Sequence, residues 1–182
     1  MSSLILILIT EVGLGALYFL VASGLSLIYG LMHVLNFAHG AFLTAGAYAA
    51  WVAAAHLSGL GGWSFPVAVL VGMVVGALIG ALVEFFLIRP LYRRHIEQVL
   101  VTVGLGLMLV ALFTGIWGPD PRPFPRPEWT TGTTNIGGAA IPNDRFLLIG
   151  AAGLLLIGLV VLLRYTRIGL IIRAGVENRT MV

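Results

Sequence analysis

A chain of 182 residues with 59% hydrophobic and only 9% charged residues cannot supply the surface of an ordinary soluble domain, in which about 25% of residues are charged. The sequence has no cysteine, which excludes disulfides, thiolate metal sites and cysteine nucleophiles. The net charge of +3 gives no reason to expect nucleic-acid binding, because the arginines lie near the ends of apolar segments. These features indicate a membrane protein.

Three long runs without Asp, Glu, Lys or Arg predict the membrane-spanning helices. Residues 12–83 leave room for three crossings, because a helix crosses the hydrocarbon in about 20 residues. Two later runs, 98–119 and 146–163, each leave room for one. We expect five spans, at about 4–31, 41–57, 65–88, 98–117 and 146–163. The runs are apolar on every side, unlike barrel strands, so the fold class is all-α, a single polytopic transmembrane domain over 1–182.

The loops predict the orientation of the chain. Prolines at alternate positions from Pro119 to Pro127 exclude a helix and favour an extended external loop over 118–144. Three arginines follow the third span and four lie in the segment 164–182, on the same side by parity, against three on the opposite side. Because arginine is enriched in cytoplasmic loops, we expect 164–182 in the cytoplasm and the N-terminus outside. A re-entrant segment at 33–40 would change this parity.

A polar patch from His33 to Gly40 interrupts the first apolar run. Polar groups at membrane depth are costly unless they face protein or a water-filled path. The patch is therefore either a break in a helix that lines a substrate route or a cytoplasmic turn between the first two spans. His33 and His39 stand six residues apart, which fits no common metal-ligand pattern, and we expect no metal site.

Glycines at every fourth position of the third span, Gly72, Gly76 and Gly80, predict close helix packing. Glu84 lies about one turn inside the end of that span, and we expect it to pair with Arg89 or with a neighbouring helix. No nucleophile elbow or phosphate-binding loop is present in the sequence. We therefore expect neither an enzyme nor a bound cofactor.

The segment after the fifth span predicts a short amphipathic helix. Ile168, Ile171, Ile172 and Val176 fall on one helical face, and Gly169 and Gly175 weaken it as a free helix by about 1 kcal/mol each. It could lie on the membrane surface or dock in a groove of a cytoplasmic partner.

Several motifs together resemble the LivH-type permeases of ABC importers for branched-chain amino acids. The first is Gly24–Gly40 (GLSLIYGLMHVLNFAHG), followed by Gly46-Ala47-Tyr48. The others are Glu84 with Arg89-Pro90-Leu91, Gly118-Pro119-Asp120-Pro121, and Thr166-Arg167-Ile168-Gly169 with Arg173-Ala174. They occur in the order found in the family, across almost the whole chain.

This resemblance implies roles for particular residues. It places Asn36, His39 and Gly40 on the translocation path. It makes the last segment, with Arg167, Gly169, Arg173 and Glu177, the part that couples the permease to its ATPase.

The resemblance also implies a function and partners. The expected function is the permease subunit of an inner-membrane ABC importer for branched-chain amino acids. The expected partners are a second homologous permease, two ATP-binding subunits that hydrolyse ATP, a periplasmic substrate-binding protein and membrane lipid, with no nucleic acid. Alternatives are a permease for urea, amides or other amino acids, or a passive pore or scaffold. Because the family continues past the coupling segment, we expect the chain to be incomplete.

Overall fold

The computed structural model describes residues 2–32, 35–167 and 169–170. The chain divides into two compact units. Unit 1 combines Met1–His33 with Glu128–Val182, and unit 2 is Val34–Pro127.

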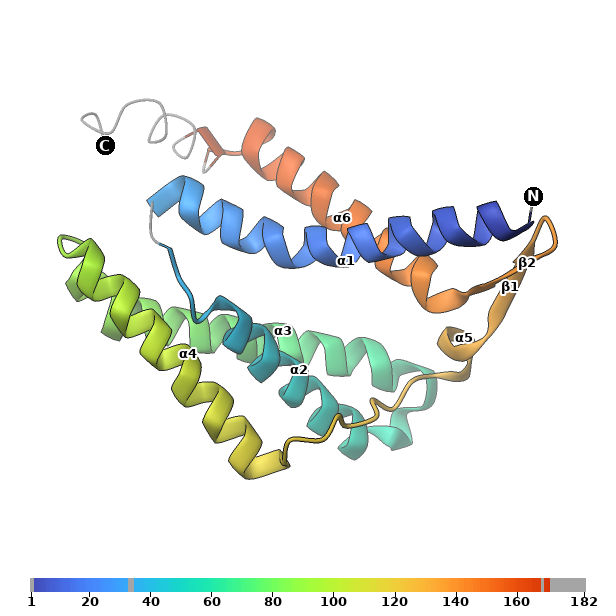
Figure 1. Ribbon diagram of the computed structural model, residues 1–182, viewed down its shortest axis with the longest axis horizontal. Coiled ribbons are helices and arrows are strands. Elements are labelled where there is room, and N and C mark those ends of the chain that lie inside the picture. The colour runs from blue at the N-terminus through green and yellow to red at the C-terminus, as the bar shows by residue number, and fades with distance from the viewer. Residues whose placement is uncertain (1, 33–34, 168, 171–182) are drawn as a thin grey trace. The chain divides into compact units, whose positions relative to one another are not determined.

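Unit 1 is built on two long helices that lie side by side, α1 (Ser2–Met32) and α6 (Asn143–Tyr165) (Figure 1). A Cβ added at Gly13 would lie 2.9 Å from Cδ and 3.4 Å from Cβ of Arg145, so it would require the Arg145 side chain to shift. The absence of a Cβ at Gly13 therefore lets the start of α6 approach α1.

A short helix, α5 (Glu128–Thr131), and a hairpin of β1 (Thr133–Ile136) and β2 (Ala139–Pro142) precede α6. The strands are antiparallel, with Thr133 opposite Pro142. Gly137 and Gly138 form the two-residue turn of the hairpin, with φ of 57° and 82°. Both angles are positive, as in a type I′ turn, and glycine adopts positive φ readily. β2 packs on α1 and buries Ile141 completely, which anchors the hairpin.

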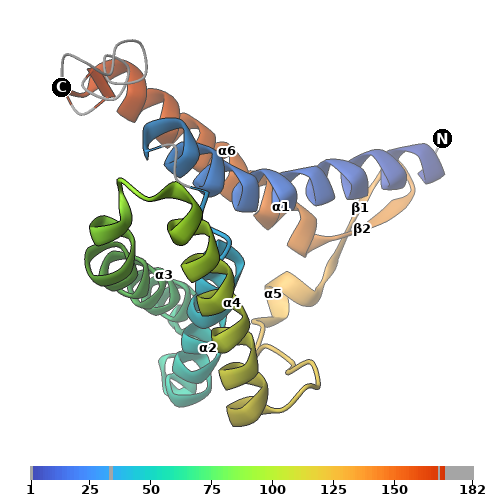
Figure 2. The ribbon, with the colours of Figure 1, turned by 60° about the vertical axis from the view of Figure 1, so that its left-hand side comes forward.

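Unit 2 is a helical layer of α2 (His39–His56), α3 (Ser64–Val83) and α4 (His95–Trp117) (Figure 2). A 3-10 turn, η1 (Ser58–Trp63), joins α2 to α3. The most extensive packing is between α2 and α3, and α4 lies against α2.

The end of the third predicted span is irregular. The α-helix gives way to a π-helix, η2 (Glu84–Ile88), and then to a 3-10 turn, η3 (Arg89–Leu91). Pro90 accounts for this change, because its ring clashes with the carbonyl of the residue four positions earlier and it has no N–H to donate.

Four of the described helices are long and apolar enough to cross a membrane: Ser2–Gly30, Gly59–Leu91, His95–Trp117 and Asn143–Tyr165. The remaining predicted span, 41–57, corresponds to α2, which has 18 residues and a histidine at each end. It is shorter than the others, and its small side chains are largely buried in unit 2. The expected all-α polytopic fold is confirmed, and these four helices together with α2 are consistent with about five spans.

Candidate functional site

The residues before α2 are not helical. Leu35 and Asn36 have no regular structure, Phe37 and Ala38 form a turn, and α2 begins at His39. Asn36 is only 6% exposed, and its side-chain oxygen accepts a hydrogen bond from the backbone N–H of Ala38 at 3.0 Å. The carbonyl of Asn36 accepts a second from the N–H of His39 at 3.3 Å. Asn36 therefore satisfies two backbone donors that the start of a helix leaves without partners.

This break lies beside the middle of α4. A Cβ added at Gly106 would lie 3.5 Å from Cα of Ala38 and 3.6 Å from the carbonyl oxygen of Phe37. Gly106 is eleven residues beyond His95, where α4 begins, which is about 16 Å along a helix. The non-helical backbone around Asn36 is therefore level with a helix centre and not with a helix end.

Two buried polar side chains on α4 belong to the same unit. Gln98 is 3% exposed and Thr102 is 1% exposed. The hydroxyl of Thr102 donates to the carbonyl of Val99 at 3.0 Å. Nε2 of Gln98 is buried without a hydrogen-bond partner among the residues that the structure describes. Neither residue was expected from the sequence to have a role, although polar side chains at i and i+4 of an apolar span mark one face of the helix.

The other two predicted path residues lie at the start of α2. His39 is its first residue and is partly buried. Gly40 is exposed, and a Cβ added there would meet no atom within 4 Å. His33 lies outside the described residues. No group of three or more histidines or acidic residues in the described part of the chain could hold a metal.

The glycines of α3 differ in their surroundings. A Cβ added at Gly72 would lie 2.6 Å from the carbonyl oxygen of Gly46 on α2 and 2.9 Å from Cβ of Ala50. At Gly76 it would make ordinary contact, 3.7 Å from the carbonyl oxygen of Phe42, and at Gly80 it would meet nothing within 4 Å. The closest approach of the two backbones is therefore at Gly72 and Gly46.

Glu84, at the start of η2, is hydrogen-bonded to the residue that follows η3. The Tyr92 hydroxyl donates to Oε1 of Glu84 at 2.5 Å, and the Arg89 guanidinium lies 5.6 Å from the centre of the Phe85 ring. Tyr92 follows the last residue of the span. Burial, and then the hydrogen bond to Glu84, raise the pKa of Tyr92 from 10.0 to about 12.

The predicted coupling segment is described only in part. Arg167 is exposed, two residues after α6 ends at Tyr165. Gly169 is buried, and its N–H donates to the hydroxyl of Thr166 at 3.0 Å. A Cβ at Gly169 would collide with the carbonyl of Leu162. Arg173 and Glu177 lie outside the described residues.

Residues 7–182 match the family described as the permease component of the branched-chain amino acid transport system. The chain belongs to this family. It is a family of transport permeases and not of enzymes, and the apolar helices make its member here a multi-pass membrane protein.

Curated proteins show the same relationship. The permease is 26% identical over 178 residues to the high-affinity branched-chain amino acid transport system permease protein LivH of Escherichia coli K12, an alignment that covers 93% of this chain and 58% of LivH. It is 22% identical over 182 residues to the corresponding protein BraD of Pseudomonas aeruginosa, covering 96% and 59%. The chain thus spans somewhat more than half the length of these relatives. No solved structure matches it.

Proposed function

We propose that this permease chain contributes to the translocation path of an ABC importer that carries branched-chain amino acids across the bacterial inner membrane. The observation that carries the proposal is the break at Asn36, beside the middle of α4. Non-helical backbone at membrane depth is tolerated where it is buried in protein or lines a water-filled cavity. Family membership supports the same function.

The path residues are Asn36, His39 and Gly40, joined by Gln98 and Thr102. An amino acid crosses as a zwitterion, so its path needs hydrogen-bond donors and acceptors inside an otherwise apolar protein. Gln98 offers a buried amide N–H that has no partner among the described residues. Leaving such a group unpaired costs about 1–3 kcal/mol, and a passing carboxylate would satisfy it when the path opens.

Energy for transport comes from partner subunits. The proposed assembly contains a second homologous permease, two ATP-binding subunits and a periplasmic substrate-binding protein. The segment that includes Arg167, Gly169, Arg173 and Glu177 docks on the ATPase. Docking can drive transport only if these contacts differ in free energy between the two states of the path. Arg173→Glu should therefore uncouple ATPase activity from addition of the binding protein.

The proposal is tested by uptake of radiolabelled leucine in cells that lack the gene. Complementation with the intact gene should restore uptake, and Asn36→Ala or Gln98→Ala should reduce it by tenfold or more. Asn135→Ala, at an exposed site on β1, is the matched control and should leave uptake unchanged. Uptake that does not change on deletion would favour a scaffold. Restoration of urea or amide uptake in place of leucine uptake would reassign the substrate.

A further inference from the structure

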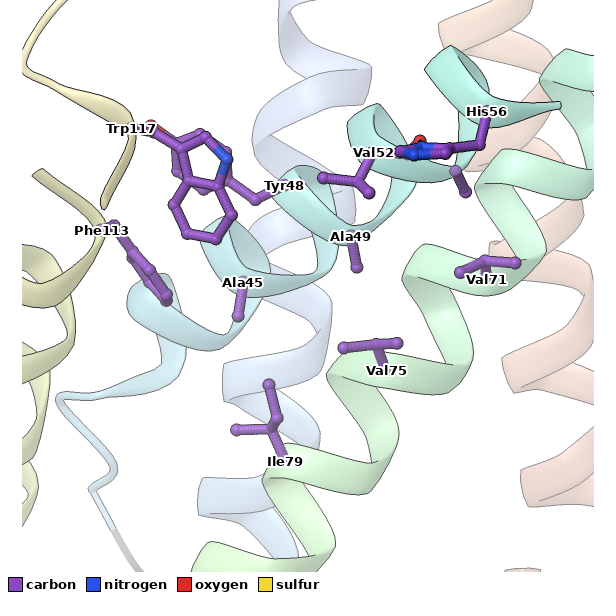
Figure 3. A pocket seen from close by; sticks show the side chains of 11 residues that line it. Ala45, Tyr48, Ala49, Val52, His56, Val71, Val75, Ile79, Phe113 and Trp117 are labelled. Atoms are coloured by element: carbon purple, nitrogen blue, oxygen red, sulfur yellow. The ribbon is translucent and has the colours of Figure 1, made fainter. Parts of the chain in front are cut away.

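An apolar groove runs between the helices of unit 2, with a volume of about 590 Å³. Figure 3 shows its two sides, with side chains of α2 along one and Val71, Val75 and Ile79 of α3 along the other. These three residues recur every four positions, so they form one stripe about 12 Å long. Phe113 and Trp117 of α4 close its end. The groove is long, narrow and almost wholly hydrocarbon.

A cation lies beside one end of the groove. Tyr48 lines both the groove and a smaller hollow of about 280 Å³, and Arg122 lines that hollow. Nε and Nη2 of Arg122 donate to the carbonyl oxygen of Trp117 at 3.2 and 2.7 Å. The guanidinium lies 5.9 Å from the centre of the Trp51 ring. Arg122 is thus tied to the residue that closes the groove.

Aromatic side chains hold this end of unit 2 together. The Tyr48 and Trp117 rings stack with their centres 4.4 Å apart, and Nε1 of Trp51 donates to the carbonyl of Pro123 at 3.0 Å. Tryptophan and tyrosine with a polar tip are enriched at the membrane–water interface. The cation therefore lies at headgroup level, and the groove extends from it into the hydrocarbon.

The charges around these hollows favour an anionic amphiphile. An arginine has five N–H donors, and the hydrogen bonds to Trp117 use two of them. The remaining donors can bind a phosphate, whose oxygens match the planar geometry of the guanidinium group. Among the described residues that line either hollow, none is acidic. No carboxylate in the lining would pair with the ammonium group of a zwitterionic amino acid, so the hollow is a poor substrate site.

We propose that the groove binds one acyl chain of an anionic phospholipid of the phosphatidylglycerol type, whose phosphate lies on Arg122. A lipid with a choline or ethanolamine headgroup brings a cation close to Arg122 and binds less well. This site is separate from the polar break at Asn36, and the inference does not depend on the transported substrate.

The test uses quenching of tryptophan fluorescence by phospholipids with a brominated acyl chain. The full chain is placed in bilayers as a Trp63→Phe, Trp129→Phe variant, so that of its four tryptophans only Trp51 and Trp117 report. At equal mole fraction, brominated phosphatidylglycerol should quench more than brominated phosphatidylcholine. Arg122→Gln should lower the preference for phosphatidylglycerol over phosphatidylcholine about tenfold, which is the loss of affinity expected when charge-assisted hydrogen bonds to the phosphate are removed. Arg126→Gln, in the same loop, is the matched control.

A second pair of variants tests the groove itself. Val75→Phe fills it and should reduce quenching by both lipids. Val74→Phe makes the same change at an exposed residue of α3 that does not line the groove, and it should change nothing. Circular dichroism checks that both variants fold.

Four results would overturn the proposal. Equal quenching by the two lipids, or an unchanged preference in Arg122→Gln, would show that Arg122 does not select the headgroup. Absence of quenching by either lipid would show that protein covers the groove. Relief of quenching by leucine, but not by unbrominated phosphatidylglycerol, would assign the hollow to the transported amino acid.

Discussion

Asn36 holds the break in place through one buried hydrogen bond. Its side-chain oxygen accepts from the N–H of Ala38, and Asn36→Ala leaves that donor buried without a partner. We expect a loss of about 1–2 kcal/mol in the free energy of unfolding, measured by thermal unfolding in detergent with circular dichroism. Asn135→Ala removes the same side chain from an exposed strand position and should have little effect. Unfolding of Asn36→Ala at the wild-type temperature would mean that water already solvates the break.

Tyr92 gives a pH-dependent prediction outside the membrane. Its pKa is raised from 10.0 to about 12, first by burial and then by the hydrogen bond to Glu84. The folded state thus favours the neutral phenol, so this contribution to stability is complete below pH 10.0 and is lost as the pH rises towards about 12. The tyrosinate absorbance of the wild type minus that of Tyr92→Phe should give the higher midpoint. Glu84→Gln should lower it, and a midpoint near 10.0 in the wild type would contradict the assignment.

At the scale of elements, the packing of α2 on α3 depends on one glycine of the three. Gly72→Ala brings a Cβ within 2.6 Å of a backbone oxygen of α2, and overpacking of this kind costs about 1–3 kcal/mol. Gly80→Ala introduces the same methyl group into open space and should be neutral or slightly stabilising. The fraction that stays monodisperse after heating, followed by size-exclusion chromatography, should fall for Gly72→Ala alone. Equal losses in both variants would show that the contact at Gly72 is not specific.

The long helices were predictable because lipid imposes a single rule on them, a run of about 20 apolar residues. The prolines of 119–127 were equally informative, and these residues contain no helix in the structure. The hairpin β1–β2 was not expected. Its strands have four residues each, too short for alternation to stand out, although Gly137-Gly138 is a turn signal. The π-helix at Glu84 was also missed, because a proline predicts a disturbance without specifying its form.

At the scale of the whole molecule, the sequence identified the polar patch but not its depth. Asn36 stood out as a polar residue in an apolar run, yet a substrate path and a cytoplasmic turn were equally compatible with that run. The close approach of Ala38 to Gly106 places the polar patch level with the middle of α4. This contact depends on packing between segments almost seventy residues apart, which a single apolar run does not reveal. Gln98 and Thr102 were overlooked for the same reason, since burial in a folded unit cannot be read from one span.

The number of crossings gives the last prediction, because α2 has the length of a span but is less apolar than the other four helices. α2 packs along α3, which is long and apolar enough to cross the membrane, and this favours five crossings. The absence of cysteine in the sequence allows single-cysteine variants to report the side on which each residue lies. Five crossings place Ser3→Cys on the same side as Pro125→Cys and opposite to Arg93→Cys, whereas four crossings place it with Arg93→Cys. We therefore expect a membrane-impermeant maleimide, added to intact spheroplasts, to label Ser3→Cys and Pro125→Cys, and to label Arg93→Cys only after permeabilisation. Labelling of Pro125→Cys alone would show that α2 enters the membrane without crossing it.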